Sequence, residues 1–416
     1  HTNDRRQRQM CIRDRLSANL CESLPHNEVS RMTPFTFNTS RSVRFGAGLI
    51  LQLGEMTRSE IGRRVLLVTD PGMLATGLVD QVKASLAKAA VHVTVFSDVV
   101  ADPPEAVVLA AAEAAKEADA DAVIGFGGGS SLDVAKLAAV LAMDDQSLKD
   151  IYGVGNITGT RLPLILIPTT SGTGSEVTPI SIVTTGKSEK MGVVSSVLIP
   201  DIALLDPELT LGLPAHVTAA TGIDAMVHAI EAYASMSANN NPLSKVLAQQ
   251  ALRLMGAALE TAVHTPRDIA ARSDMLLGSL LAGQAFANSP VAAVHALAYP
   301  IGGHYKVPHG LSNALVLPQV LRFNAVIAPR PYAEIAACAF PDLAGLGTQA
   351  AAAAFAEAMA DLAKRCGLQQ RLRDLGIERG ALPMLADDAM NQARLLVNNP
   401  RTVTQADALA IYEAVW

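Results

Sequence analysis

From Phe35 onward, short apolar runs rich in β-branched residues alternate with longer segments of helical periodicity. The short runs end at turn-forming residues and predict buried strands at residues 63–70, 91–100, 121–129, 162–170 and 201–207. Between them, segments such as "PPEAVVLAAAEAAKEA" and "SLDVAKLAAVLA" predict helices. Because strand and helix alternate, we expect a mostly parallel sheet with helices on both of its faces.

The strand pattern stops after about Leu211, and the chain from there to Trp416 fits helices broken by Pro, Gly or Asn. We therefore expect an α/β domain over residues 32–210, followed by an all-α domain over residues 211–416. In this arrangement ligands are expected in the cleft between the strand ends and the helical domain.

Residues 1–31 have no hydrophobic period and no apolar segment of a signal peptide. Their run "RQMCIRDR" resembles translated sequencing-adapter DNA. We expect a non-native or disordered leader here, with Met32 as the natural start, and exclude it from the functional argument.

Composition narrows the classes of partner. Apolar residues make up 50% of the 416 and charged residues 17%, and the formal net charge is −6. With no basic block after the first fifteen residues, neither nucleic acid nor a membrane surface is an expected partner, and the apolar runs fall short of the ~20 residues that span a bilayer.

The four cysteines form no C-x-x-C pair, which argues against a disulfide framework or a thiolate zinc site. A reducing cytoplasm is the expected location.

Two loops that follow predicted strands have the composition of a nucleotide site. In "GFGGGSSLDVAK" (125–136), glycines let the backbone approach a phosphate, and the next helix offers free N–H groups. A plain strand-to-helix turn is the alternative, but it does not need three successive glycines. The second loop, "PTTSGTGSEVTP" (168–179), is dense in hydroxyls and glycines.

An acidic residue for the ribose precedes the glycines instead of following them. Asp70, at the end of the strand 63–70, could accept hydrogen bonds from an adenosine ribose and repel a 2′-phosphate. That would favour NAD over NADP. An Asp before Pro-Gly is equally typical of a turn.

The helical segment "ATGIDAMVHAIEAYAS" (220–235) places Asp224 four residues before His228. Two residues at this spacing project from one face of a helix and could share a metal ion. Taken alone, such a pair is more often a hydrogen-bonded couple.

A second segment, "VHALAYPIGGHYKVPHG" (294–310), adds three more histidines: His295, His304 and His309. We expect Pro300 and the following glycines to interrupt its helix, so that the chain turns back and brings His295 and His309 together. One carboxylate and three imidazoles suit Fe(II) or Zn(II), with open positions for a substrate oxygen.

The motifs occur in a recognisable order: "VTD", "DAVIGFGGGSSLDVAK", "PTTSGTGSEVTP", "KMGVVSSVLIPDIALLDPELT", "ATGIDAMVHAIEAY", "VHALAYPIGGHYKVPHGLSNALVLP" and "NNPR". In this order the chain resembles the iron-containing (group III) alcohol dehydrogenases of the dehydroquinate-synthase-like superfamily, from about Phe35 to Trp416. The resemblance implies a nucleotide-binding α/β domain, a helical metal-binding domain and an active site between them.

The resemblance also implies the site residues. One divalent metal would be held by Asp224, His228, His295 and His309. Contacts to NAD, or less favourably NADP, would come from Asp70, Asp102, Gly128, Gly129, Ser130, Asp133, Thr169, Thr170, Thr173 and Lys190.

The chain departs from the family pattern at one position of the histidine segment. Many members have a second histidine four residues after the first, often considered a proton relay or substrate contact, whereas this chain has Tyr299. A phenol donates a hydrogen bond but is a poorer proton acceptor near neutral pH than imidazole. Tyr299 and His304 are therefore the candidate catalytic residues, and packing at the rim is the alternative for His304.

The implied activity is metal-assisted hydride transfer between nicotinamide and a small or medium aliphatic alcohol or aldehyde, by a homo-oligomer. A hydroxyacid–oxoacid transhydrogenase with bound nicotinamide is an alternative, although its histidine segment is longer than the fourteen-residue spacing here. A dehydroquinate-synthase-like lyase and a non-enzymatic nucleotide or metal sensor are more distant alternatives.

Overall fold

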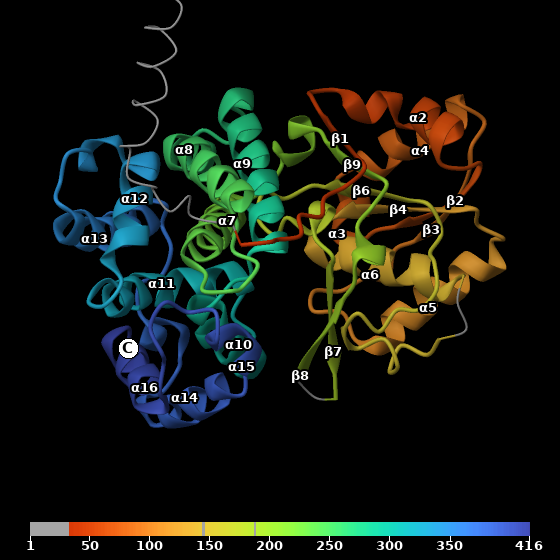
Figure 1. Cartoon of the computed structure of the whole chain (residues 1–416). Helices are drawn as coiled ribbons and strands as arrows, with labels where there is room; N and C mark the ends of the chain where they lie inside the picture. The colour runs from red at the N-terminus through yellow and green to blue at the C-terminus, as the bar shows by residue number, and fades with distance from the viewer. Residues whose placement is uncertain (1–32, 144–145, 187–188) are drawn as a thin grey trace, which may run out of the picture. The chain divides into compact units, whose positions relative to one another are not determined.

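A six-stranded parallel sheet forms the centre of the N-terminal half (Figure 1). The computed structural model describes residues 33–143, 146–186 and 189–416, so the expected leader, residues 1–31, lies outside the described residues. The sheet has the order β1-β9-β6-β4-β2-β3. Its strands are β1 (Ser42–Phe45), β2 (Arg64–Val68), β3 (His92–Phe96), β4 (Ala122–Gly127), β6 (Leu164–Pro168) and β9 (Ile202–Leu205). All five strands predicted from apolar runs are confirmed, and the short edge strand β1 was not predicted.

Helices cover both faces of this sheet, as expected (Figure 1). One face packs against α2 (Leu53–Glu60) and α4 (Leu78–Lys88), and the other against α5 (Glu105–Glu117) and α6 (Gly129–Leu141). Short helices fill the connections: α3 (Pro71–Ala75) and the 3-10 turns η1 (Leu49–Gln52), η2 (Ser175–Val177), η3 (Ser196–Leu198) and η4 (Pro207–Thr210). Alternate side chains of the strands point to opposite faces, so the two layers of helices enclose separate apolar cores.

A smaller sheet was missed by the sequence analysis. In it β8 (Glu189–Val194) pairs antiparallel with β7 (Ile180–Thr185) and parallel with the two-residue strand β5 (Gly153–Val154). Its strands are partly exposed, and β8 carries Glu189 and Lys190, so it lacks the continuous apolar run of a buried strand. This sheet places Lys190 beside the site described below.

The C-terminal half is helical, and the described residues after β9 contain no strand. Its long helices are α7 (Ala215–Ala234), α8 (Pro242–His264), α9 (Ile269–Asn288), α10 (Ala293–Tyr305), α11 (His309–Ala325), α12 (Pro329–Ala339), α13 (Thr348–Arg365) and α16 (Gln405–Ala414). Shorter ones are α14 (Leu382–Met390), α15 (Ala393–Leu396), η5 (Pro341–Leu343), η6 (Leu372–Leu375) and η7 (Arg379–Ala381). The predicted change from α/β to all-α architecture therefore falls between Leu205 and Ala215. None of the described helices is long and apolar enough to cross a membrane.

One expectation about the histidine segment was wrong. Helix α10 continues through Pro300 and the two glycines to Tyr305, and the turn comes afterwards, at Lys306 (φ 57°) and Pro308. Proline removes one main-chain hydrogen bond from a helix, and the buried packing of α10 maintains the helix across that gap. The reversal is nevertheless achieved, because α11 begins at His309.

The two halves pack together through α9. Leu276 and Leu280 of this helix share an apolar cluster with Ala203 and Leu205 of β9 and with Val177 of η2. The loop 168–179 also lies against α7, the first helix of the all-α half, because a Cβ at Gly172 would lie 2.7 Å from Thr221 Cβ.

Candidate active site

Three predicted nucleotide-binding segments meet at one edge of the main sheet. Strands β6, β4 and β2 are neighbours and parallel, so their carboxyl ends place Thr169, Gly128 and Asp70 side by side. The Asp70 carboxylate accepts a hydrogen bond from the Met73 N–H (3.1 Å) and one from Ser131 Oγ (3.2 Å). It therefore caps α3 and also contacts the start of α6.

The start of α6 has the features of an anion site. Gly128 is its N-cap residue and provides no side-chain cap, so the first N–H groups of the helix remain available to a ligand. A Cβ at Gly129 would lie 2.8 Å from Thr173 Cγ2, so the two loops approach each other as closely as a glycine permits. A cavity of about 1210 Å³ opens here, large enough for a dinucleotide. Six of the predicted cofactor residues line it: Asp70, Gly128, Gly129, Ser130, Thr169 and Thr170.

The other four predicted cofactor residues, Asp102, Asp133, Thr173 and Lys190, line a second cavity of about 270 Å³. Gly129 and Ser130 line both cavities, so the two are adjacent. Lys190 is paired with Asp102. Both Asp133 oxygens accept hydrogen bonds from the protein, so this side chain supports the end of the loop 168–179.

Asp133 is part of a buried polar network that ties α6 to the loop 168–179. Its Oδ1 accepts from Ser175 Oγ (2.6 Å) and its Oδ2 from the Ile182 N–H (2.9 Å). The fully buried Lys136 ammonium donates to Ser175 Oγ (2.8 Å) and to the Ile180 carbonyl (2.7 Å). Burial lowers the pKa of Lys136, against the opposing charge of nearby carboxylates. The sequence analysis did not identify Lys136.

Glu176 in the same loop is also buried, and its Oε1 has no hydrogen-bond partner. Burial raises the pKa of Glu176 from 4.5 to about 7, and Lys136 only partly opposes this. The folded chain thus binds this proton more tightly than the unfolded chain does, so stability falls as the pH rises from 4.5 through about 7.

We therefore expect Glu176→Gln to lose less stability than the wild type between about pH 5 and about pH 8, by at most about 3 kcal/mol. Thermal unfolding of both proteins at the two pH values measures this. Equal losses of stability in the two proteins would contradict the assigned titration.

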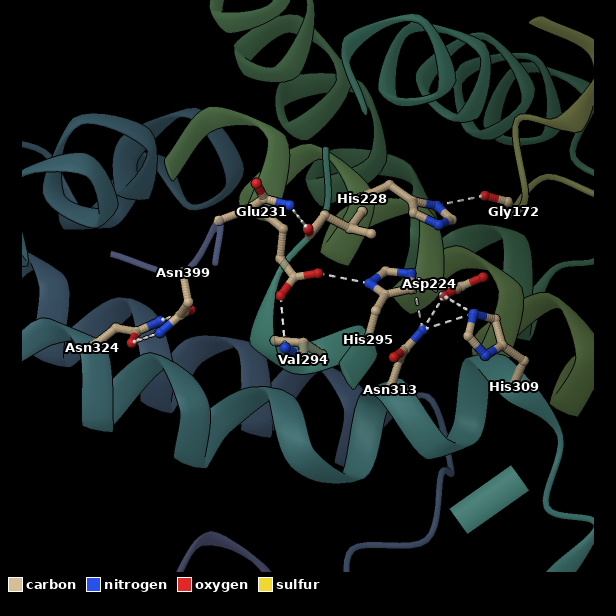
Figure 2. Close-up of polar contacts among 12 residues, drawn as sticks. Gly172, Asp224, His228, Glu231, Val294, His295, His309, Asn313, Asn324 and Asn399 are labelled. Atoms are coloured by element: carbon tan, nitrogen blue, oxygen red, sulfur yellow. Dashed lines mark hydrogen bonds and ion pairs between the residues drawn. The ribbon is translucent and has the colours of Figure 1, made fainter. Parts of the chain in front are cut away.

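Two neighbouring helices bring three predicted metal ligands together (Figure 2). Asp224 and His228 lie on one face of α7, and His295 lies in the first turn of α10. One ligand atom from each lies within 4.8 Å of the others, and the three residues are 2%, 5% and 2% exposed. Burial of three such groups together requires a partner for their lone pairs.

The Nδ1 atoms of both buried imidazoles, His228 and His295, contact oxygen atoms of the protein. A carbonyl oxygen can only accept, so His228 Nδ1, 3.2 Å from the Gly172 oxygen, carries its proton. His295 Nδ1 lies 2.6 Å from Glu231 Oε2. Burial lowers the pKa of both histidines, which keeps the imidazoles neutral. Their Nε2 lone pairs are therefore free for a cation.

The Asp224 carboxylate remains ionised despite its burial. Burial alone would raise the pKa of Asp224, but the electrostatic effect of the neighbouring imidazoles, that of His309 first, and a hydrogen bond from Asn313 together lower it. The site thus combines one anionic and two neutral ligands, a set typical of a divalent transition metal.

His309 and Asn313 complete the site from α11. His309 Nε2 lies 3.7 Å from Asp224 Oδ1, but the residue falls outside the cluster of three, and its side chain is 36% exposed. A Cβ at Gly310 would lie 2.3 Å from the Ala220 oxygen, so glycine allows α11 to approach α7 this closely.

The Asn313 amide nitrogen is 2.5 Å from Asp224 Oδ1, 3.2 Å from His309 Nε2 and 3.4 Å from His295 Nε2. Three acceptors thus converge on an amide that has two hydrogens, while Asn313 Oδ1 is buried without a partner. A cation would satisfy all three acceptors, so these residues fit a bound metal.

The remaining walls of this cavity are mostly apolar. The Phe286 ring stacks on His228 at a centroid distance of 4.3 Å, and Tyr299 lies 5.7 Å from the His309 ring. Burial raises the pKa of Tyr299, so its phenol stays protonated near neutral pH. Arg394 also lines the cavity and was not identified from the sequence.

The structure does not bring His304 into this cavity. Its Nε2 lies 2.9 Å from Asp388 Oδ2, and both residues line a separate outer cavity of about 900 Å³. Tyr299, Lys190 and Arg394 line both cavities, so the two cavities are adjacent. His304 thus lies at the rim.

Family models match nearly the whole of the described chain. Residues 40–207 match the model for iron-containing alcohol dehydrogenase, and residues 218–416 match the C-terminal model of the Fe-containing alcohol dehydrogenase family. The chain belongs to the iron-containing alcohol dehydrogenase family. It is therefore an oxidoreductase that acts on alcohols, in a family that uses a metal and NAD(H).

Individual members of the family support the same assignment. Long-chain-alcohol dehydrogenase 1 of Geobacillus thermodenitrificans is 43% identical, covering 89% of this chain and 94% of its own. NAD-dependent methanol dehydrogenase of Bacillus methanolicus is 33% identical, covering 88% and 96%. The crystal structure of a 1,3-propanediol oxidoreductase superposes with a TM-score of 0.89 at 34% identity, covering 92% of this chain and all of that one.

Proposed function

We propose that this iron-containing alcohol dehydrogenase interconverts small or medium aliphatic alcohols and their aldehydes with NAD, at one divalent metal held by Asp224, His228, His295 and His309. The observation that carries the proposal is the shared cavity of about 270 Å³, lined both by these four residues and by the predicted cofactor residues Thr173 and Lys190. The proposed metal ligands and the proposed cofactor contacts thus face the same cavity.

The bound metal, Fe(II) or Zn(II), would supply a Lewis acid that polarises the substrate oxygen, and NAD would accept the hydride. The chain's own task is to position the reactants and exclude water. Phe286, Val291 and Leu395 supply apolar walls. The protonated Tyr299 phenol can donate a hydrogen bond to a substrate oxygen, whereas His304, held by Asp388 at the rim, can only serve protons that travel through the outer cavity.

For the cofactor we propose NAD in preference to NADP. The Asp70 carboxylate lines the larger cavity next to the start of α6, where a 2′-phosphate would meet its charge. The pairing of Lys190 with Asp102 would hold both residues at the junction with the smaller cavity. Ten residues make up the proposed cofactor contacts: Asp70, Asp102, Gly128, Gly129, Ser130, Asp133, Thr169, Thr170, Thr173 and Lys190.

The substrate range is proposed from the cavities. An inner space of about 270 Å³ suits a small alcohol, and the outer cavity of about 900 Å³ gives a longer chain room to extend past Tyr299. The names of the relatives span methanol, 1,3-propanediol and long-chain alcohols.

The test is a panel of alcohols of increasing length with free NAD. We expect alcohol-dependent NADH formation without any 2-oxoacid, together with the reverse reduction of aldehydes. Turnover that appears only when a 2-oxoacid is added would instead indicate a transhydrogenase that keeps its nicotinamide bound.

Three further expectations belong with this proposal. We propose domains over residues 32–210 and 211–416, supported by the two family models, which meet between residues 207 and 218. We also propose a homo-oligomer and a cytoplasmic location, the latter supported by four scattered cysteines that form no C-x-x-C pair.

A further inference from the structure

Glu231 lies one helical turn beyond His228 on α7 and is 5% exposed (Figure 2). One of its carboxylate oxygens accepts from the Val294 N–H at 2.7 Å, and the other contacts His295 Nδ1 at 2.6 Å. A buried carboxylate costs free energy unless it is well paired. Both oxygens of Glu231 are paired with the first turn of α10, so its position there is specific.

The first turn of α10 depends on this contact. The N-cap residue of the helix, Ala292, offers no side-chain cap, and the Val294 N–H in its first turn is satisfied by Glu231 from α7. His295 is the next residue. Glu231 therefore holds both the backbone before this histidine and the imidazole itself.

We propose that Glu231 is a positioning residue for the metal, acting through His295. A carboxylate can only accept hydrogen bonds, so Glu231 in this form keeps the proton on His295 Nδ1, 2.6 Å away, and leaves the Nε2 lone pair facing Asp224. Helix α7 then supplies two ligands and also sets the tautomer and orientation of the third. This inference rests on the proposed metal site.

Glutamine cannot reproduce this arrangement, although it has nearly the same shape. If its oxygen faces the Val294 N–H, its NH₂ group faces His295 Nδ1 and moves the imidazole proton to Nε2, where it blocks a metal. If its oxygen faces His295, the NH₂ group opposes the Val294 N–H and the start of α10 is disturbed. The first arrangement removes the Nε2 lone pair that a metal needs, and the second leaves the buried Val294 N–H without an acceptor.

The test measures the dissociation constant of Co²⁺ by competition with a chelator. It compares the wild type with Glu231→Gln, His295→Ala and the double variant, and with Glu357→Gln as the matched control. Glu357 lies on the surface and pairs with Arg322 at 2.7 Å, so its substitution removes the same charge far from the site. NAD affinity of the metal-free proteins, measured in parallel, reports on the fold.

We expect Glu231→Gln to weaken Co²⁺ binding by about 10–100-fold, Glu357→Gln to leave it unchanged, and NAD affinity to be unchanged in both. In the His295→Ala background, Glu231→Gln should weaken Co²⁺ binding little further, because its effect depends on the imidazole that this background lacks. A general structural defect would instead reduce affinity by the same factor in both backgrounds, and this result would overturn the inference. Glu231→Asp, which keeps the charge but shortens the reach, runs through the same cycle in case the glutamine variant does not fold.

The two proposals fail in different ways. If His295→Ala binds Co²⁺ as the wild type does, the ligand assignment is wrong and the role of Glu231 falls with it. If His295→Ala loses the metal while Glu231→Gln retains it fully, only the inference about Glu231 is overturned.

Discussion

Replacing His228 by alanine is expected to abolish alcohol-dependent NADH formation and to weaken metal binding by more than about a hundredfold. The physical reason is that His228 is a proposed direct ligand, whereas loss of an outer partner already costs about 10–100-fold. Its imidazole is buried, neutral and held by the Gly172 carbonyl, so its removal leaves the proposed metal with one ligand fewer. Metal affinity and turnover of butanol with NAD are the measurements.

A matched control separates this effect from the loss of any histidine. His264→Ala removes an exposed imidazole from α8, whose Nε2 contacts the Arg365 oxygen at 3.0 Å, and should leave both quantities unchanged. NAD binding to the metal-free His228→Ala protein should persist, because the larger cavity does not include His228. A variant that folds, keeps its metal and turns over normally would remove His228 from the ligand set.

Asp70→Asn is expected to raise the efficiency with NADP relative to NAD by about tenfold or more, or about 1.4 kcal/mol. Asparagine keeps an oxygen that can cap α3 through the Met73 N–H, and so preserves the local fold while it removes the charge. The kcat/KM values for the two cofactors at saturating alcohol measure the change. Asparagine is preferable to glycine here, because glycine would remove the capping contact as well as the charge.

The control for this prediction is Asp80→Asn, which neutralises an exposed carboxylate on α4 near Lys83. We expect it to leave the cofactor ratio unaltered. If Asp70→Asn leaves the NAD/NADP ratio at its wild-type value, the carboxylate does not select the cofactor.

The main sheet was predictable because its buried strands are continuous apolar runs. Strands β2, β4, β6 and β9 have this pattern, and the loops after them follow from their glycines and hydroxyls. The small sheet was not predictable, since β8 reads "EKMGVV" and is partly exposed. The path of α10 through Pro300 was also missed, because its continuity depends on tertiary packing and local sequence gives no sign of this.

For the candidate metal site, the sequence indicated which residues come together but not which side chains hold them in place. The pair Asp224 and His228 follows from helical spacing, and the structure brings His295 to them from α10. Glu231 could have been found three residues after His228 on the same helix, but its partner, His295, lies sixty-four residues away. Asn313 gave no local signal, since only the approach of α11 to α7 places its amide against the ligands.

The metal content of the wild-type protein, purified without added metal, tests the central claim most directly. We expect about one iron or zinc ion per chain. Its removal by a chelator should abolish alcohol-dependent NADH formation, and addition of the same metal should restore it. Full alcohol-dependent turnover by protein that contains no divalent metal would contradict the account.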